Sequence, residues 1–188
     1  MSEVKEKIIE ALLLTERKGM EDLIFHLDEI GFFTQPASTS ASKHSAKEGG
    51  LAEHSFNVYN LANEINGWMG FNLDTKSIRI AALLHDVGKA GQFGKAGYVQ
   101  NILASGKRSD KKPYETNKDL LPVEHEIRSV QIISRYIELT EEESFAILYH
   151  NGMYGALKYQ LQGNETPLQM LVHFADMWAS RVIEGGEE

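Results

Sequence analysis

Apolar residues recur with the period of an α-helix through most of this sequence, and that pattern limits the fold more than any other feature. The period runs through residues 3–16, 20–30, 51–66, 75–86, 123–137, 140–150 and 167–183. Helix-start signals support two of these segments, because Thr140 is followed by Glu143 in a capping-box pattern and Thr166 precedes Pro167. The sequence therefore predicts an all-α fold.

Two stretches interrupt the helical pattern. Residues 34–50 are rich in Ser, Pro and Gly, and we expect them to form a loop. Between about Gly91 and Leu121 the period fails, and the short runs 98–103 and 112–116 flank a Ser-Gly-Lys turn. This arrangement predicts a small β-hairpin excursion from the helices.

The composition fits one globular domain. The 188 residues are 42% hydrophobic and 24% charged, which suffices for one core, so we expect a single domain over residues 1–188. No run of about 18 apolar residues occurs, and the N-terminal segment carries charges throughout, so we expect neither a membrane span nor a signal peptide. A cytoplasmic location is the expectation that follows.

Cysteine is absent, which excludes disulfides and thiolate metal sites. Any metal must therefore be bound by His, Asp and Glu. The net charge of −8 disfavours a broad nucleic-acid-binding surface. One basic stretch, residues 106–112, departs from this balance. We favour a solvated loop tip there over a role in guiding phosphate.

Two polar residues occupy positions that the helical period assigns to the interior. His54 shares a stripe with Leu51 and Val58, and Asp176 shares one with Val172. A buried carboxylate needs a partner, and a cation is the natural one. A lone buried histidine, however, is more often a hydrogen-bonded core residue than a ligand.

Further ligand-type residues lie at the ends of predicted helices. His85 and Asp86 are adjacent where a helix is expected to stop before Gly88. His125 lies near the start of the next predicted helix, and His150 closes the one after it. Nitrogen and oxygen ligands at several helix ends favour a metal site over isolated core residues.

In this order the residues resemble the motifs of the HD superfamily of metal-dependent phosphohydrolases. The matching segments are Gly49-Gly-Leu-Ala-Glu-His54-Ser, Ala82-Leu-Leu-His85-Asp86-Val-Gly-Lys89, His125, Leu148-Tyr-His150 and His173-Phe-Ala-Asp176. The preceding stretch 36–50 is also similar to the lead-in of some bacterial and phage members. The resemblance implies one irregular bundle of roughly seven or eight helices. Residues 1–48 would then form an N-terminal helical extension and loop, and 49–184 the metal-binding core.

The resemblance also implies a divalent metal site of one or two ions, with Mn, Fe, Mg, Ni and Zn all open. Its ligands would be His54, His85, Asp86, His125, His150 and Asp176. His125 and His150 match positions that hold a second ion in some members, and Asp86 would then bridge the two. His125 lacks the glycine neighbours of related sequences, which leaves the number of ions open.

Other residues are expected to act with Asp86 in catalysis. Lys89 follows the HD pair and is expected either to donate to a phosphate oxygen or to hold Asp86 by a hydrogen bond. Arg128 lies one turn after His125, where phosphate binding and a solvated surface position are equally expected. His44 in the lead-in loop can touch substrate or give a proton to the leaving group, the alternative being a simple loop histidine.

Secondary expectations concern His173 and the aromatic residues. His173 lies one turn before Asp176 and is expected to orient it or to pack at the helix flank. Core packing is the expectation for most aromatic residues at helical spacings or helix ends. These are Phe25, Phe32, Phe33, Trp68, Phe71, Phe145, Phe174 and Trp178.

The leading functional hypothesis is a metal-dependent phosphohydrolase that cleaves a phosphoester, by a metal-activated hydroxide, of a nucleotide or related small phosphorylated molecule. A di-iron oxygenase is the alternative enzyme, because the same ligands can hold two irons, and a metal-dependent binding or regulatory protein without turnover is the third hypothesis. The expected partner is the small phosphorylated substrate, with no membrane, and a homo-oligomer stays open.

Overall fold

The computed structural model describes residues 3–42 and 45–185, and helices account for most of its regular structure. The α-helices are α1 (Glu3–Leu13), α2 (Met20–Glu29), α3 (Gly50–Met69), α4 (Thr75–Leu84), α5 (His125–Ile133), α6 (Glu141–Leu148), α7 (Lys158–Leu161) and α8 (Pro167–Trp178). Short helical turns follow at η1 (Val87–Lys89), η2 (Gly152–Tyr154) and η3 (Ala179–Ile183). The predicted all-α class is confirmed.

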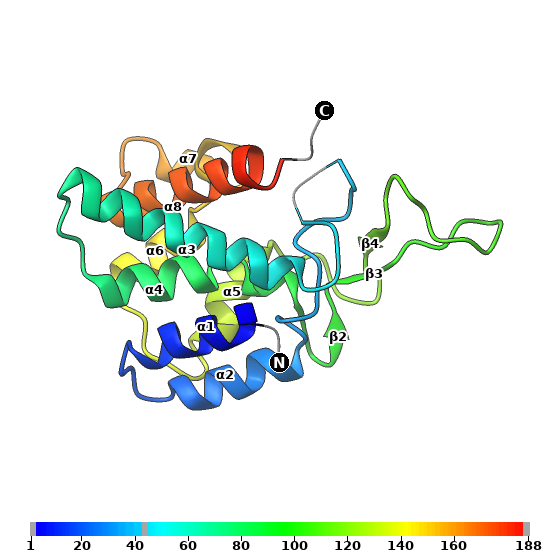
Figure 1. Cartoon of the computed structure of the whole chain (residues 1–188), viewed down its shortest axis with the longest axis horizontal. Coiled ribbons are helices and arrows are strands. Elements are labelled where there is room, and N and C mark those ends of the chain that lie inside the picture. Colours follow the sequence, from blue (N-terminus) through cyan, green and yellow to red (C-terminus); the bar gives the residue numbers. More distant parts are fainter. Residues whose placement is uncertain (1–2, 43–44, 186–188) are drawn as a thin grey trace.

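Helix α4 lies at the centre of the core. Its residues from Ile80 to Leu84 are all fully buried, which fits a helix with neighbours on every side. Helices α1, α3, α6 and α8 pack around it, with α3 also against α8 (Figure 1). Burial of each large apolar side chain stabilises the bundle by about 1.5–3 kcal/mol, so the C-terminal end of α4 is firmly held.

Side-chain caps begin three of these helices. Asp74 accepts hydrogen bonds from the backbone N–H groups at the start of α4, and Thr166 caps α8, whose first residue is Pro167. At α6, Thr140 and Glu143 form the reciprocal capping box that the sequence predicted.

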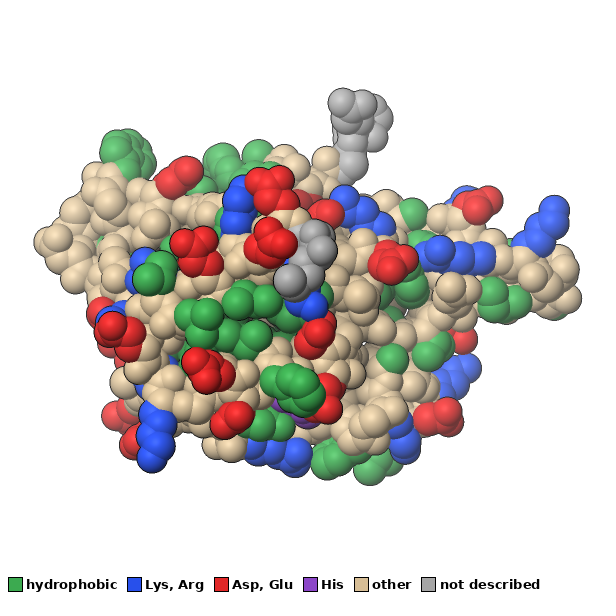
Figure 2. Space-filling model, turned by 60° about the horizontal axis from the view of Figure 1, so that its bottom comes forward, with side chains coloured by type: hydrophobic (Ala, Val, Ile, Leu, Met, Phe, Trp, Pro, Cys, Tyr) green, Lys and Arg blue, Asp and Glu red, His purple; other side chains and the backbone are tan. Residues whose placement is uncertain are grey.

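The excursion after α4 contains two hairpins. The predicted one pairs β3 (Tyr98–Gln100) with β4 (Tyr114–Thr116) in antiparallel register. The sequence did not predict the smaller one, in which β1 (Gly91–Gln92) pairs with β2 (Lys95–Ala96) through a turn of left-handed residues. The β3–β4 hairpin and its loop project from the helical body (Figure 1), and Lys and Arg side chains lie along this projection (Figure 2).

Several predicted element ends differ from the structure. Helix α5 starts two residues later than expected, at His125, and α8 gives way to a π-helical turn at Ala179. The elements α7 and η2 were not predicted. None of the helices in the described part of the chain is long and apolar enough to cross a bilayer.

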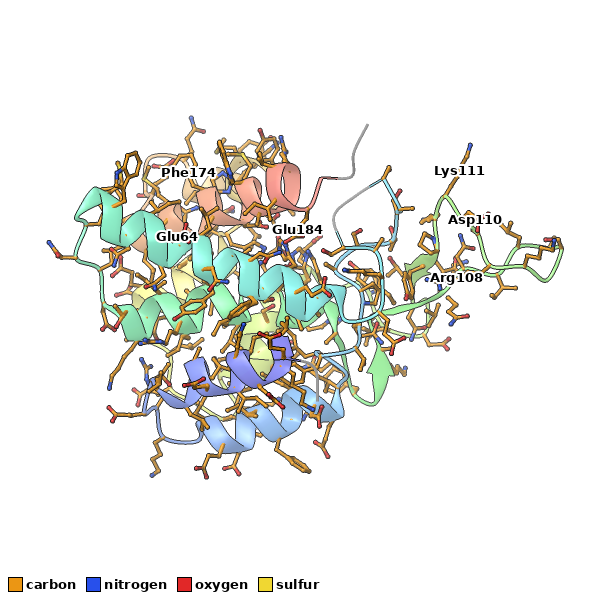
Figure 3. All side chains as sticks on the ribbon, viewed as in Figure 1. Glu64, Arg108, Asp110, Lys111, Phe174 and Glu184 are labelled. Atoms are coloured by element: carbon orange, nitrogen blue, oxygen red, sulfur yellow. The ribbon has the colours of Figure 1, made fainter. Side chains whose placement is uncertain are left out.

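The expectation that most aromatic residues pack in the core is wrong. Phe32 and Phe33 are buried, whereas five others of that set are exposed. The exposed ones are Phe25, Trp68, Phe71, Phe174 and Trp178. Helical spacing alone does not distinguish the inner face of a peripheral helix from its outer face, and Phe174 lies on the outer side of α8 (Figure 3).

Candidate metal centre

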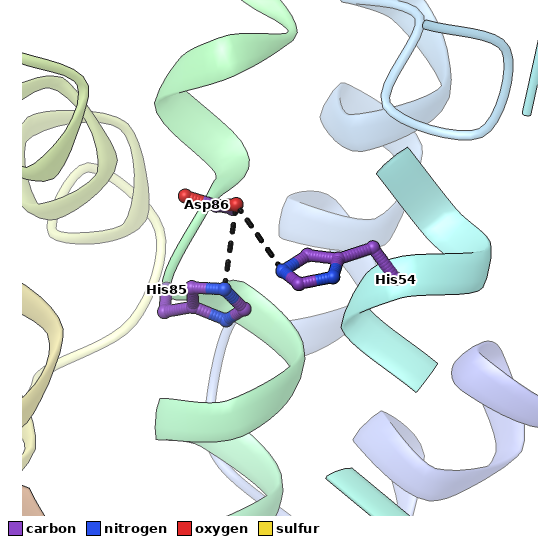
Figure 4. Close-up of side chains that lie close together, drawn as sticks. All are labelled: His54, His85 and Asp86. Atoms are coloured by element: carbon purple, nitrogen blue, oxygen red, sulfur yellow. Dashed lines mark ion pairs between the residues drawn. The ribbon is translucent and has the colours of Figure 1, made fainter. Parts of the chain in front are cut away.

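Four of the predicted ligands lie around one carboxylate, that of Asp86, and Asp176 lies beside His54. His54 lies on α3, His85 and Asp86 follow α4, His125 begins α5, His150 follows α6 and Asp176 lies on α8. Asp86 Oδ2 lies 3.6 Å from His54 Nε2 and 3.4 Å from His85 Nε2 (Figure 4). Asp86 Oδ1 lies 3.2 Å from His125 Nε2 and 3.4 Å from His150 Nε2. Each oxygen of Asp86 therefore faces its own pair of imidazoles.

Backbone carbonyls orient two of the imidazoles. His85 Nδ1 donates to the carbonyl oxygen of Ala82 at 2.8 Å, and His150 Nδ1 donates to that of Ile147 at 2.8 Å. In the neutral ring, this hydrogen bond leaves Nε2 with a lone pair that faces Asp86. His85 Nε2 is fully enclosed and has no hydrogen-bond donor among residues 3–42 and 45–185. A buried acceptor beside a carboxylate calls for a cation.

A carboxylate lies beside Nδ1 of each of the other two imidazoles, and the sequence did not predict either. Glu184 lies 3.1 Å from His54 Nδ1, and Glu126 lies 3.3 Å from His125 Nδ1. Glu184 also accepts hydrogen bonds from Asn57 and Ser45 and lies between η3 and α3 (Figure 3). Carboxylate–histidine pairs of this kind fix the ring orientation and raise the basicity of the facing nitrogen.

Asn151 is a further residue that the sequence did not predict. Its side-chain amide donates to Glu126 at 2.7 Å and lies 3.0 Å from His150 Nε2 and 3.3 Å from His125 Nε2. It therefore links the two imidazoles on the Oδ1 side of Asp86. In the sequence, only its position directly after His150 could have indicated that Asn151 lies at this site.

The local charges favour an ionised Asp86 with positive charge beside it. Burial by itself would raise the pKa of Asp86, but Lys89 and the histidines hold that pKa well below its usual range. Burial likewise opposes protonation of His54, yet hydrogen bonds with Asp176 and Glu184 raise its pKa to about 9. The centre therefore attracts positive charge, which a proton or a metal ion can supply.

The donor set fits divalent metal ions. His54, His85 and Asp86 form one group of converging ligand atoms, and Asp86, His125 and His150 form another. Imidazole nitrogens and carboxylate oxygens are ligands for Mn, Fe, Ni and Zn, while Mg prefers oxygen. A third group joins His85 and His150 to Asp176, whose Oδ1 also lies 3.1 Å from His54 Nε2. The bridging role of Asp86 stays a prediction.

Lys89 contacts Asp86 directly. Its ammonium group donates to Asp86 Oδ2 at 2.6 Å, which is one of the two roles expected from the sequence. Gly88, one residue earlier, lies against the backbone of His125, where any side chain would collide with α5. This close approach holds the start of α5 next to the HD pair.

The remaining sequence expectations fare differently. Arg128 is buried rather than solvated, and its guanidinium donates to Gln92 at 2.8 Å and to the carbonyl oxygen of Leu121 at 2.9 Å. Phosphate binding by Arg128 stays a prediction, which these engaged donors do not favour. His173 Nδ1 donates to the carbonyl oxygen of His150 at 2.7 Å. This hydrogen bond holds His173 against the end of α6 and does not orient Asp176. His44 lies outside the described residues.

A pocket of about 670 Å³ opens beside the centre, next to Lys89 and His125. His125 and Asp176 are 26% and 17% exposed in their side chains, whereas Asp86 is 1% exposed. A reactant would therefore meet the centre from the partly exposed side.

Residues 51–178 match the family model of the HD domain, and all of the predicted ligands fall within this range. Neither the curated proteins nor the solved structures contain a match to the chain.

Proposed function

The chain belongs to the HD domain family, and on that basis we propose that it is a metal-dependent phosphohydrolase acting on a nucleotide or a related small phosphorylated molecule. The observation that carries the proposal is the arrangement around Asp86. One buried carboxylate faces two imidazoles from each of its oxygens, and this geometry supports a pair of ions that share Asp86.

Bound divalent ions would supply positive charge beside the phosphoryl oxygens and lower the pKa of a water molecule. In the hydrolysis, the water oxygen forms a bond to phosphorus, the bond from phosphorus to the leaving oxygen breaks, and a proton passes from the water to the leaving oxygen. Hydrogen bonds at Nδ1 hold three of the four imidazoles, those of His54, His85 and His150, so their Nε2 atoms need little reorganisation.

Lys89 would act at the border between the centre and the pocket. Its ammonium holds Asp86 in place and lines the pocket as well, so it can also approach a phosphate oxygen. Both roles that the sequence predicted for Lys89 are compatible with this position.

The test is hydrolysis of p-nitrophenyl phosphate and bis(p-nitrophenyl) phosphate by the full chain with added Mn²⁺. We expect cleavage that is lost on chelation and in Asp86→Asn but kept in Asp110→Asn, a matched change at an exposed aspartate of the excursion. Iron-dependent consumption of dioxygen without ester cleavage would instead support the oxygenase and overturn the proposal.

A further inference from the structure

The pocket beside the metal centre is larger than one phosphate group requires. Its volume of about 670 Å³ lies in the range of pockets that enclose whole small molecules, roughly 300–1,000 Å³. From Lys89 and His125 it extends along the β3–β4 hairpin and the segment that follows it. Most of a bound substrate would therefore contact the excursion rather than the helices.

The lining of this pocket is basic in an acidic protein. It contains Lys89, Lys112, Lys118 and Arg128 against Glu115 and Glu124, whereas the whole chain has a net charge of −8. Lys89 and Arg128 are engaged by protein groups. Lys112 and Lys118 are exposed, and neither forms an ion pair with any residue that the structure describes. Their charges are available to a ligand.

Hydrogen bonds hold the wall that carries Lys118 at both ends. Asn117 donates from its side chain to the carbonyl oxygen of Ala96 at 2.9 Å, and Lys95 donates to that of Asp119 at 2.6 Å. At the far end, Arg128 donates to the carbonyl oxygen of Leu121. A wall fixed in this way lowers the entropic cost of binding, because it need not be ordered by the ligand.

The same wall ends in an apolar lip. Leu121 and Val123 are 79% and 40% exposed, and both line the pocket with Pro122 between them. Exposed apolar side chains at the mouth of a basic pocket suit a ligand with a flat apolar part as well as negative charge.

We propose that the pocket binds a substrate with at least two phosphate groups, of which one is hydrolysed at the metal centre and another is held by Lys112 and Lys118. A nucleotide with a di- or triphosphate group, or with phosphates at two positions, has this chemistry. The proposal rests on the proposed function, the hydrolysis of one phosphoester, and adds that the substrate carries a second phosphate group.

The first arm of the test compares hydrolysis of nucleoside mono-, di- and triphosphates by the Mn²⁺-loaded full chain. The variants are Lys112→Met and Lys118→Met, which keep the apolar stem, and Lys107→Met as the matched control outside the pocket lining. We expect kcat/KM for the multiply phosphorylated substrates to fall about tenfold per pocket lysine, since a charge-assisted hydrogen bond is lost. The loss should be smaller for p-nitrophenyl phosphate, which carries one phosphate group, and Lys107→Met should leave the cleavage of every substrate unchanged.

The second arm needs no turnover. Calorimetry on the metal-loaded chain compares orthophosphate with imidodiphosphate, whose bridging nitrogen resists hydrolysis. Tighter binding of imidodiphosphate that disappears in the double lysine variant supports the inference, even if no phosphoester is ever cleaved. Equal binding of the two anions, unaffected by both lysine changes, overturns it, even if the chain proves to be a phosphohydrolase.

Discussion

Two buried carboxylates, Glu143 and Asp86, are surrounded by opposite kinds of partner. Glu143 accepts hydrogen bonds from Arg17 at 2.8 and 3.0 Å, from Ser77 at 2.8 Å and from the backbone of Thr140 at 2.9 Å. Each of these partners is a permanent donor. The cluster joins the starts of α4 and α6 to the turn after α1, so it stabilises the fold and leaves nothing for a ligand.

Asp86 instead faces groups that are hydrogen-bond acceptors until they bind a proton or a metal ion. Apart from Lys89, its neighbours are imidazole Nε2 atoms, which carry lone pairs in the neutral ring. The amide of Asn151 reaches His125 Nε2 and His150 Nε2, whereas His85 Nε2 has no hydrogen-bond partner among the described residues. A proton or a metal ion would satisfy it. The difference teaches that burial of a carboxylate does not indicate function, whereas burial among aligned lone pairs does.

The largest expected effect is the stabilisation that metal confers. At a metal concentration 1,000 times the Kd, the free energy of unfolding should rise by about 4 kcal/mol, because the ion binds the folded chain. Asp86→Asn should abolish this increment and Glu143→Gln should keep it, as measured by urea unfolding with and without Mn²⁺. An equal rise in unfolding free energy in both variants would contradict the distinction between the Asp86 and Glu143 clusters.

Truncation of the other carboxylate should act on the fold alone. Glu143→Ala leaves Arg17 without its ion-pair partner, though Arg17 still donates to the carbonyl oxygen of Glu138. Because the Arg17 side chain is 23% exposed, we expect a loss of about 3 kcal/mol of unfolding free energy. Glu142→Ala, an exposed neighbour on α6, is the control and should cost little. The metal content per folded chain should not change, and a fall in metal content would contradict the assignment.

A smaller effect is expected at Glu184, which orients His54. Glu184→Gln keeps an oxygen that can accept from Nδ1 but removes the charge, so metal affinity should fall by roughly 10–100-fold, as for other supporting partners of metal-binding histidines. Titration calorimetry with Mn²⁺ measures this, with Glu165→Gln as an exposed control and Glu184→Asp as a partial rescue. Unchanged affinity alongside lower stability would mean that Glu184 only anchors the C-terminal segment.

The smallest effect is a pH dependence of the structural cluster. Although burial opposes it, hydrogen bonds from Arg17, Thr140 and Ser77 lower the pKa of Glu143 below its usual value of 4.5. A lowered pKa in the folded state gives stability that is present above about pH 4.5 and is lost as the pH falls through the folded value. The difference in unfolding free energy between wild type and Glu143→Gln should therefore shrink from pH 7 to pH 3. A constant difference would contradict the ionised pair.

The sequence predicted what depends on local pattern. Helical period located the long helices, and the order of ligand-type residues pointed to side chains that the fold brings together as groups able to hold a metal. The capping role of Glu143 was also readable, because Thr140 precedes it by three residues.

Contacts between distant segments could not be read in this way. Glu143 is 126 residues from Arg17, and Glu184 is 130 residues from His54. No period or spacing links such pairs, since packing of the helices alone brings them together. For the same reason the burial of Arg128 could not be predicted, because its partners Gln92 and Leu121 lie in the irregular excursion.

The central claim is that Asp86 joins two metal sites, and the metal-to-chain ratio tests it most directly. Elemental analysis would compare the full chain, purified without added metal and after reconstitution, with His125→Ala and with His26→Ala as a histidine control on α2. We predict about two ions per chain, halved in His125→Ala and unchanged in His26→Ala. Absence of bound metal after reconstitution, or a single ion insensitive to His125→Ala, would contradict the account.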